Sequence, residues 1–276
     1  MNITLQQPGS PARAQLFPER RALDRVVAPL DAFAGNSSRL LSGSLGQFES
    51  VGQPYRLPRY VYLGPKGGGD TIRIGVFAAI HGDEPAGALA LARFVSALEK
   101  TPEIAQGYAL FLYPVCNPTG FEDQTRHSRS GKDLNREFWQ QSAEPEVRFL
   151  ESEICLHAFD GIITLHSDDT SDGLYGFVNG AVLSENLLEP ALRAAEQYLP
   201  RNRRRIIDGF SAHQGIICDG YPGMLQSLPG LRRPPFEITL ETPQQAPLQR
   251  QVAAFSAALQ TILVEFRQLL AIAKNI

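Results

Sequence analysis

From residue 71 onward, short apolar runs typical of buried strands alternate with longer stretches of helical periodicity. Strands are predicted at 72–79, 109–115, 161–165 and 236–240, and helices at 85–99, 144–157, 184–199 and 247–273. This alternation implies a mostly parallel mixed sheet with helices on both faces, because parallel strands are joined by crossover helices. Neither an internal repeat nor a low-complexity linker interrupts the pattern, so we predict a single α/β domain over residues 1–276.

The first third of the chain is predicted to add one helix and two strands to this core. Residues 1–18 contain three prolines, which disfavour long regular elements and indicate a loosely ordered arm. A helical pattern covers about 19–33, and strand-like runs cover 40–48 and 60–63. The connection between the two strands is predicted to contain Gly52, Pro54 and Pro58.

The charge balance argues against nucleic-acid binding. Lys and Arg number 26 against 29 Asp and Glu, and the one basic run, at 201–205, is expected to be a solvated surface segment. No apolar run reaches the roughly 18 residues of a membrane span, and the N-terminus lacks a signal-peptide pattern. Three cysteines without a CxxC spacing fit a reducing compartment. We therefore expect a cytoplasmic protein with no membrane partner and no propeptide, while its oligomeric state stays open.

The segment 80–85, Ile-His-Gly-Asp-Glu-Pro, follows the strand predicted at 72–79 and precedes the helix predicted at 85–99. Open α/β sheets place their sites at the carboxyl ends of strands, so His81 and Glu84 should lie at such a site. An imidazole and a carboxylate in one tight turn suit a zinc ion that takes a third protein ligand and keeps one open position. The alternative is that Glu84 is a first-turn helix acid and His81 a turn residue.

Two further predicted strands end on residues of the same chemical types. The strand at 161–165 is followed by His166, which is well placed to be a third metal ligand, or else a core histidine. The strand at 236–240 is followed by Glu241, which shares a strand face with Glu237 because side chains alternate with a period of two. Glu241 is the better placed of the two acids because it stands at the strand end.

A polar segment follows the strand predicted at 109–115. Its arginines include Arg126 and Arg136, and Asn135 precedes the second of them. Arginine suits a planar carboxylate or a developing oxyanion, because its guanidinium donates paired, charge-assisted hydrogen bonds. The alternative is that Asn135 and Arg136 only cap a turn.

The order and spacing of these motifs resemble the zinc carboxypeptidase superfamily, which includes the succinylglutamate desuccinylases and aspartoacylases. The resemblance covers about residues 70–270 and implies the zinc carboxypeptidase type of fold, phosphorylase/hydrolase-like, with one zinc ion per chain. It implies that zinc is bound by His81, Glu84 and His166 and that the oxyanion is stabilised by Arg126. It also implies that the substrate carboxylate is bound by Asn135 and Arg136 and that Glu241 is the general base.

Three features qualify the resemblance. The family's usual asparagine two residues after the oxyanion arginine is Ser128 here, so Arg129 remains an alternative to Arg126. Tyr221, between glycines, is similar in position to the mobile substrate-binding tyrosine of the carboxypeptidases, although a plain turn tyrosine is equally compatible. Only 35 residues follow Glu241, too few for the extra C-terminal β-rich domain of the desuccinylases and aspartoacylases.

We therefore predict a zinc-dependent hydrolase that cleaves an amide bond next to a free carboxylate, most simply a carboxypeptidase-like metallopeptidase. The alternative is a deacylase of N-acyl amino acids, and a third reading is a zinc-binding scaffold without activity. A nucleotide-binding domain is disfavoured because no glycine fingerprint occurs. The expected substrate is a small peptide or an acyl-amino acid. Asp168 and Asp169 are expected to be solvated loop acids rather than partners of a basic substrate group.

Overall fold

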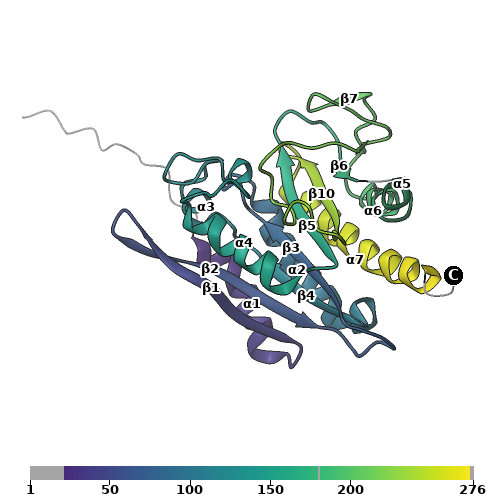
Figure 1. Ribbon diagram of the computed structural model, residues 1–276, viewed down its shortest axis with the longest axis horizontal. Coiled ribbons are helices and arrows are strands. Elements are labelled where there is room, and N and C mark those ends of the chain that lie inside the picture. The colour runs from purple at the N-terminus through teal and green to yellow at the C-terminus, as the bar shows by residue number, and fades with distance from the viewer. Residues whose placement is uncertain (1–21, 180, 274–276) are drawn as a thin grey trace, which may run out of the picture.

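An eight-stranded mixed sheet forms the centre of the protein in the computed structural model, which describes residues 22–179 and 181–273 (Figure 1). The strand order is β1-β2-β4-β3-β5-β10-β6-β9. The strands are β1 (Leu40–Ser50), β2 (Gln53–Leu63), β3 (Ile72–Ala78), β4 (Tyr108–Tyr113), β5 (Gly161–Asp168), β6 (Tyr175–Val178), β9 (Ile216–Ile217) and β10 (Phe236–Pro243). A separate small hairpin consists of β7 (Ile206–Ile207) and β8 (Phe210–Ser211).

The four central strands β4, β3, β5 and β10 run parallel, and β2 and β6 flank them in antiparallel orientation. The central strands are buried along nearly their whole length, as near-continuous apolar sequences in parallel sheets are. Their carboxyl ends therefore meet at one edge of the sheet, where the loops that follow them lie together.

Helices cover both faces of the sheet. The helices are α1 (Leu23–Asn36), α2 (Pro85–Lys100), α3 (Pro118–Asp123), α4 (Pro145–His157), α5 (Ala181–Leu183), α6 (Glu189–Ala195) and α7 (Leu248–Ala273). The larger hydrophobic core joins one face of the sheet to α1, α2, α6 and α7. The smaller core joins the other face to α4 (Figure 1). The predicted single α/β domain with a mostly parallel sheet is confirmed.

The C-terminal helix α7 is long and apolar enough to cross a membrane by length and composition alone. The central helix of a soluble domain also meets that criterion. In this structure α7 packs on α2 and α6, and one of its faces is buried in the larger core. We therefore describe α7 as a core helix of the domain.

The prediction for the second strand was wrong in its extent. β2 begins at Gln53, so the connection to β1 is only Val51 and Gly52, and both prolines lie inside the strand. Residues 53–59 of β2 pair with β1 alone, while pairing with β4 starts at Tyr60. A proline is tolerated there because the side without a neighbouring strand needs no N–H donor.

The helix predicted at 184–199 was also wrong in its form. A π-helical turn at Ser184–Leu188 precedes α6, which ends at Ala195. Pro190 has no N–H with which to continue the regular ladder, which accounts for the irregular turn before it. The short strands β6 and β9 were not predicted. The predicted arm at 1–18 lies outside the described residues, and the first helix begins at Leu23.

Candidate metal centre and substrate pocket

The loop after β3 places His81 and Glu84 at the carboxyl edge of the sheet. Ala79 has a left-handed backbone conformation, with φ of 49°, and this turns the chain out of the strand. Gly82 then lies against the backbone of α3, where an added Cβ would stand 1.9 Å from the carbonyl carbon of Gly120. Only glycine fits such a close approach, so the loop that carries the two side chains is held rigidly.

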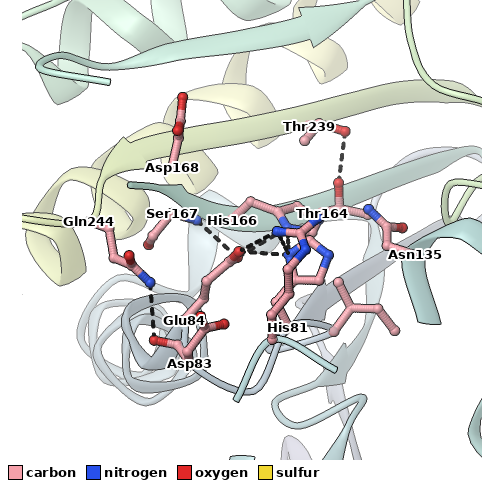
Figure 2. A network of polar contacts seen from close by, with 12 residues as sticks. His81, Asp83, Glu84, Asn135, Thr164, His166, Ser167, Asp168, Thr239 and Gln244 are labelled. Carbon is pink, nitrogen blue, oxygen red and sulfur yellow. Dashed lines mark hydrogen bonds and ion pairs between the residues drawn. The ribbon is translucent and has the colours of Figure 1, made fainter. Parts of the chain in front are cut away.

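Neighbouring strands bring two more of the sequence-predicted residues to the same edge. His166 lies on β5 and Glu241 on β10, and the two residues are direct partners in the parallel register. Since β5 also pairs with β3, the three strand ends converge. Figure 2 shows His81, Glu84 and His166 gathered around one point.

The three side chains form a buried group with the geometry of a metal site. The Nδ1 atoms of His81 and His166 are 3.3 Å apart, and Glu84 lies 2.6 Å from the first through Oε1 and 3.1 Å from the second through Oε2. Two nitrogen ligands of a tetrahedral zinc ion would be about 3.3–3.4 Å apart, given Zn–N distances of about 2.0–2.1 Å. In the described part of the chain, this is the only group of three or more His, Cys, Asp or Glu residues whose possible ligand atoms all lie within 4.8 Å of one another.

The protonation of these groups also suits a cation. Burial would raise the pKa of the Glu84 carboxyl, but the two imidazoles outweigh it and lower that pKa below its ordinary value. Its Oε2 accepts the backbone N–H of Ser167 at 3.0 Å, which fixes the carboxylate. The residues present therefore fit a bound zinc ion, and they would hold it through two nitrogens and one carboxylate.

Asp133, which the sequence analysis did not single out, orients this site. Nε2 of His81 donates to Asp133 Oδ1 at 3.3 Å, which leaves the lone pair of Nδ1 free to bind a metal. Asp133 also accepts from Arg126, with Nη2 at 3.0 Å. Burial opposes ionisation of Asp133, yet His81 and then Arg126 lower its pKa. In the sequence, the only indication of this role was that Asp133 stands two residues before Asn135.

A pocket of about 380 Å³ opens beside His81, Glu84 and His166. Every residue predicted to act in the site lies on its wall: His81, Glu84, Arg126, Asn135, Arg136, His166, Tyr221 and Glu241. The wall also contains residues that the sequence analysis did not select, among them Tyr175, Asp208, Met224 and Thr239.

The two candidate oxyanion arginines lie in different environments. Arg126 is on the pocket wall, with Nη1 at 3.3 Å from His81 Nδ1 and 3.8 Å from Glu84 Oε1. Arg129 instead binds Asp123 with Nε and Nη2, at 2.6 and 2.8 Å, and does not line the pocket. The geometry thus favours Arg126 for a role in chemistry and Arg129 for a structural one.

Asn135 and Arg136 form an open corner of the pocket with hydrogen-bond donors that no described carboxylate occupies. Asn135 Oδ1 accepts the backbone N–H of Leu225 at 2.8 Å, and its amide nitrogen has no acceptor in the described chain. The guanidinium of Arg136 donates to its neighbour's carbonyl and forms no ion pair with any described carboxylate. It lies 4.4 Å from the centre of the Tyr221 ring, whose hydroxyl donates to the carbonyl of Asp208 in the β7–β8 hairpin.

Of the two acids on one face of β10, Glu241 lies on the pocket wall and Glu237 does not. Burial, followed by the negative charges of Glu84 and Asp168, raises the pKa of the Glu241 carboxyl well above its ordinary value. A raised pKa makes this carboxyl a better proton acceptor, as general base catalysis requires. Glu237 accepts the backbone N–H of Ser227 at 2.6 Å.

The predicted loop acids Asp168 and Asp169 also reach the pocket wall. Asp168 is half-buried and accepts hydrogen bonds from Tyr175 Oη at 2.8 Å and from the N–H and hydroxyl of Thr170, each at 2.7 Å. Figure 2 shows it directed away from the histidines. Asp169 is exposed. Asp168 therefore stabilises the loop after β5 rather than the metal site.

The fold and the site define an α/β protein with one candidate metal site, among the described residues, beside an open corner formed by Asn135 and Arg136. The family model of the succinylglutamate desuccinylase/aspartoacylase catalytic domain matches residues 70–202. A search of the curated proteins found no match.

Solved structures from bacteria are similar to the chain over most of its length. A candidate metallopeptidase from Shewanella amazonensis SB2B has 26% identity and a TM-score of 0.74, over 87% of this chain and 91% of its own. A second, from Shewanella denitrificans OS217, has 23% identity and a TM-score of 0.73, over 87% and 89%. A metallo-carboxypeptidase from Burkholderia cenocepacia has 17% identity and a TM-score of 0.70, over 91% of this chain and 70% of its own.

The chain is therefore similar to the zinc carboxypeptidase superfamily, which includes the metallocarboxypeptidases and the desuccinylase and aspartoacylase branch: the family model matches residues 70–202, and the solved structures share the fold.

Proposed function

We propose that this protein is a zinc-dependent hydrolase that cleaves an amide bond adjacent to a free carboxylate, in the manner of a carboxypeptidase. The observation that carries the proposal is the open corner that Asn135 and Arg136 form on the pocket wall. Arg136 has no carboxylate partner in the described residues, and Asn135, whose amide nitrogen has no acceptor there, lines the same pocket as the His–Glu–His group. Paired donors of this kind suit a carboxylate.

Each of these pocket residues has a separate proposed role in amide hydrolysis. A zinc ion held by His81, Glu84 and His166 would supply a Lewis acid and an acidified water. Asn135 and Arg136 would hold the substrate carboxylate and so fix the position of the amide bond. Arg126 would donate hydrogen bonds to the negative charge that develops on the carbonyl oxygen, an interaction whose loss typically costs about 10²–10³ in kcat.

Glu241 is the proposed general base. Its carboxylate would accept a proton from the attacking water and return it to the leaving nitrogen, for which a raised pKa is an advantage. Its place opposite His166 in the strand register puts it beside the metal ligands without making it one of them. Asp133 would act only through His81 and Arg126, as a positioning residue.

A second candidate is the hydrolysis of N-acyl amino acids. The family model that matches residues 70–202 describes the succinylglutamate desuccinylase/aspartoacylase catalytic domain, which favours this reading. Both reactions break an amide bond next to a carboxylate, so the same residues would serve either. The two differ in the acyl group, which is a peptide in one case and a small acid in the other.

A substrate panel tests the proposal. The zinc-loaded protein is offered short peptides with a free C-terminal carboxylate, the same peptides with a C-terminal amide, and N-acetyl and N-succinyl amino acids. The proposal expects hydrolysis of the free peptides and at least about 100-fold slower hydrolysis of the amidated ones, because the amide loses the ion pair with Arg136. Equal rates for the two peptide forms would refute it, and exclusive hydrolysis of the N-acyl amino acids would establish the second candidate.

A further inference from the structure

A buried glutamine in the first turn of α7 forms four side-chain hydrogen bonds at the carboxyl edge of the sheet. Gln251 is 3% exposed and does not line the catalytic pocket. Its Oε1 accepts from Ser167 Oγ at 3.0 Å and from Thr242 Oγ1 at 2.9 Å. Its Nε2 donates to the carbonyls of Gln244 at 3.1 Å and Ala246 at 2.7 Å. The side-chain amide therefore uses both of its lone pairs and both of its N–H donors.

These partners fix the orientation of the amide. Carbonyl oxygens can only accept, so the N–H₂ group must face Gln244 and Ala246, and the oxygen must face the two hydroxyls. A fully buried glutamine is uncommon, and its removal would take a hydrogen-bond partner from each of these four groups. The four bonds therefore hold Gln251 in one conformation, and with it the ends of β5 and β10.

The two hydroxyl residues come directly after residues of the site. Ser167 and Thr242 are partners in the parallel register of β5 and β10, as His166 and Glu241 are one position earlier. The hydroxyls of Ser167 and Thr242 also lie 3.0 Å from each other. Gln251 therefore joins the two strand ends one residue beyond the proposed third ligand and the proposed base.

The segments that Gln251 holds also contact the loop that carries Glu84. The backbone N–H of Ser167 donates to Glu84 Oε2 at 3.0 Å, and the side-chain amide of Gln244 donates to the carbonyl of Asp83 at 3.4 Å. Figure 2 shows both contacts beside the two histidines. A displacement of Ser167 would therefore change the position of one oxygen of a proposed zinc ligand.

We propose that Gln251 is a positioning residue for the metal site, which fixes Ser167 and thereby holds the Glu84 carboxylate in the orientation that binds zinc. This inference rests on the proposed function for the identity of the metal. Outer hydrogen-bond partners orient ligating carboxylates, and their loss typically costs about 10- to 100-fold in metal affinity. Gln251 forms no hydrogen bond with His81, Glu84 or His166 in the described chain, so it acts only through the strand ends.

The test measures zinc affinity by competition with a chelating dye, on variants whose circular dichroism shows that they are folded. Gln251→Met has a similar length and removes all four hydrogen bonds, so it should bind zinc at least about 10-fold more weakly than wild type. Gln260→Met is the matched control, because Gln260 lies on the same helix and its amide donates to Ser256 within that helix. The zinc affinity of the control should stay within about twofold of wild type, since none of these bonds reaches the site.

Gln251→Asn is the second variant and keeps the test decisive where Gln251→Met does not fold. Its amide is one methylene shorter, so it cannot reach the hydroxyls and the carbonyls together, and zinc affinity should again fall by about 10-fold. A purely structural role for Gln251 would lower the unfolding temperature and leave the zinc affinity of the folded variants unchanged. That result would overturn the inference.

Zinc affinity is measured without substrate, so this inference and the proposed reaction can fail separately. Weaker zinc binding by the Gln251 variants, in a protein that hydrolyses none of the peptides, would support the positioning role and refute the proposed reaction. Peptide hydrolysis by wild type, with an equal zinc affinity in the folded Gln251 variants, would retain the reaction and overturn the inference. A wild type that binds no zinc would refute both.

Discussion

The buried carboxyl of Glu146 should make the free energy of unfolding depend on pH, and Glu146→Gln should remove this dependence. The residue lies in the first turn of α4 and is 2% exposed. Its Oε2 has no hydrogen-bond partner in the part of the chain that the structure describes. Burial, with a further contribution from the charge of Glu144, raises the pKa of the Glu146 carboxyl from 4.5 to about 7.

The sign and size of the effect follow from linkage. The folded protein binds this proton more tightly than the unfolded chain, so the stabilisation is present below about pH 4.5 and is lost as the pH rises through about 7. Between pH 5 and pH 8 this amounts to about 2.5 kcal/mol of unfolding free energy. Glu146→Gln keeps the shape and cannot ionise, so its stability relative to wild type should rise by about this amount over the same interval.

Urea denaturation at pH 5 and pH 8, followed by circular dichroism, measures the two free energies of unfolding for each protein. Glu49→Gln on the exposed face of β1 serves as the control, and its difference from wild type should not depend on pH. A Glu146→Gln variant whose difference from wild type is the same at both pH values would show that Glu146 is not a buried, destabilised carboxylate.

Three further substitutions test the site itself. Asp133→Asn should weaken the interactions that orient His81 and Arg126. Zinc affinity, measured by titration against a chelating dye, should then fall by about 10- to 100-fold. An unchanged affinity would show that Asp133 does not orient the site. Gly82→Ala should lower stability by at least about 1–3 kcal/mol because its Cβ would meet the backbone of Gly120, whereas Gly68→Ala, with nothing within 4 Å of its Cβ, should be nearly neutral in thermal unfolding. Glu241→Gln should retain zinc while kcat falls by about 10²–10⁴, and an active variant would refute its assignment as the base.

The strand ends that carry the site could be predicted from sequence because each belongs to an uninterrupted apolar run. His81, His166 and Glu241 all follow such runs, and parallel strands bring their carboxyl ends to one edge. The same reasoning failed for β2, because whether a proline interrupts a strand depends on which neighbour that part of the strand has.

Other parts of the site depend on contacts between segments far apart in the chain. The choice between Arg126 and Arg129 depends on Asp123, which binds Arg129 and turns it away from the pocket. The role of Asp133 depends on its distance from His81, 52 residues earlier in the chain. Neither relation leaves a local pattern in the sequence.

The zinc content of the purified protein shows whether His81, Glu84 and His166 bind a metal ion. Elemental analysis of wild type is compared with His81→Ala, and with His127→Ala as a control at an exposed histidine outside the ligand group. We expect about one zinc ion per chain in wild type and in the control, and loss of the ion in His81→Ala. A wild-type protein that binds no metal when zinc is supplied, or a His81→Ala variant with an unchanged zinc content, would contradict it.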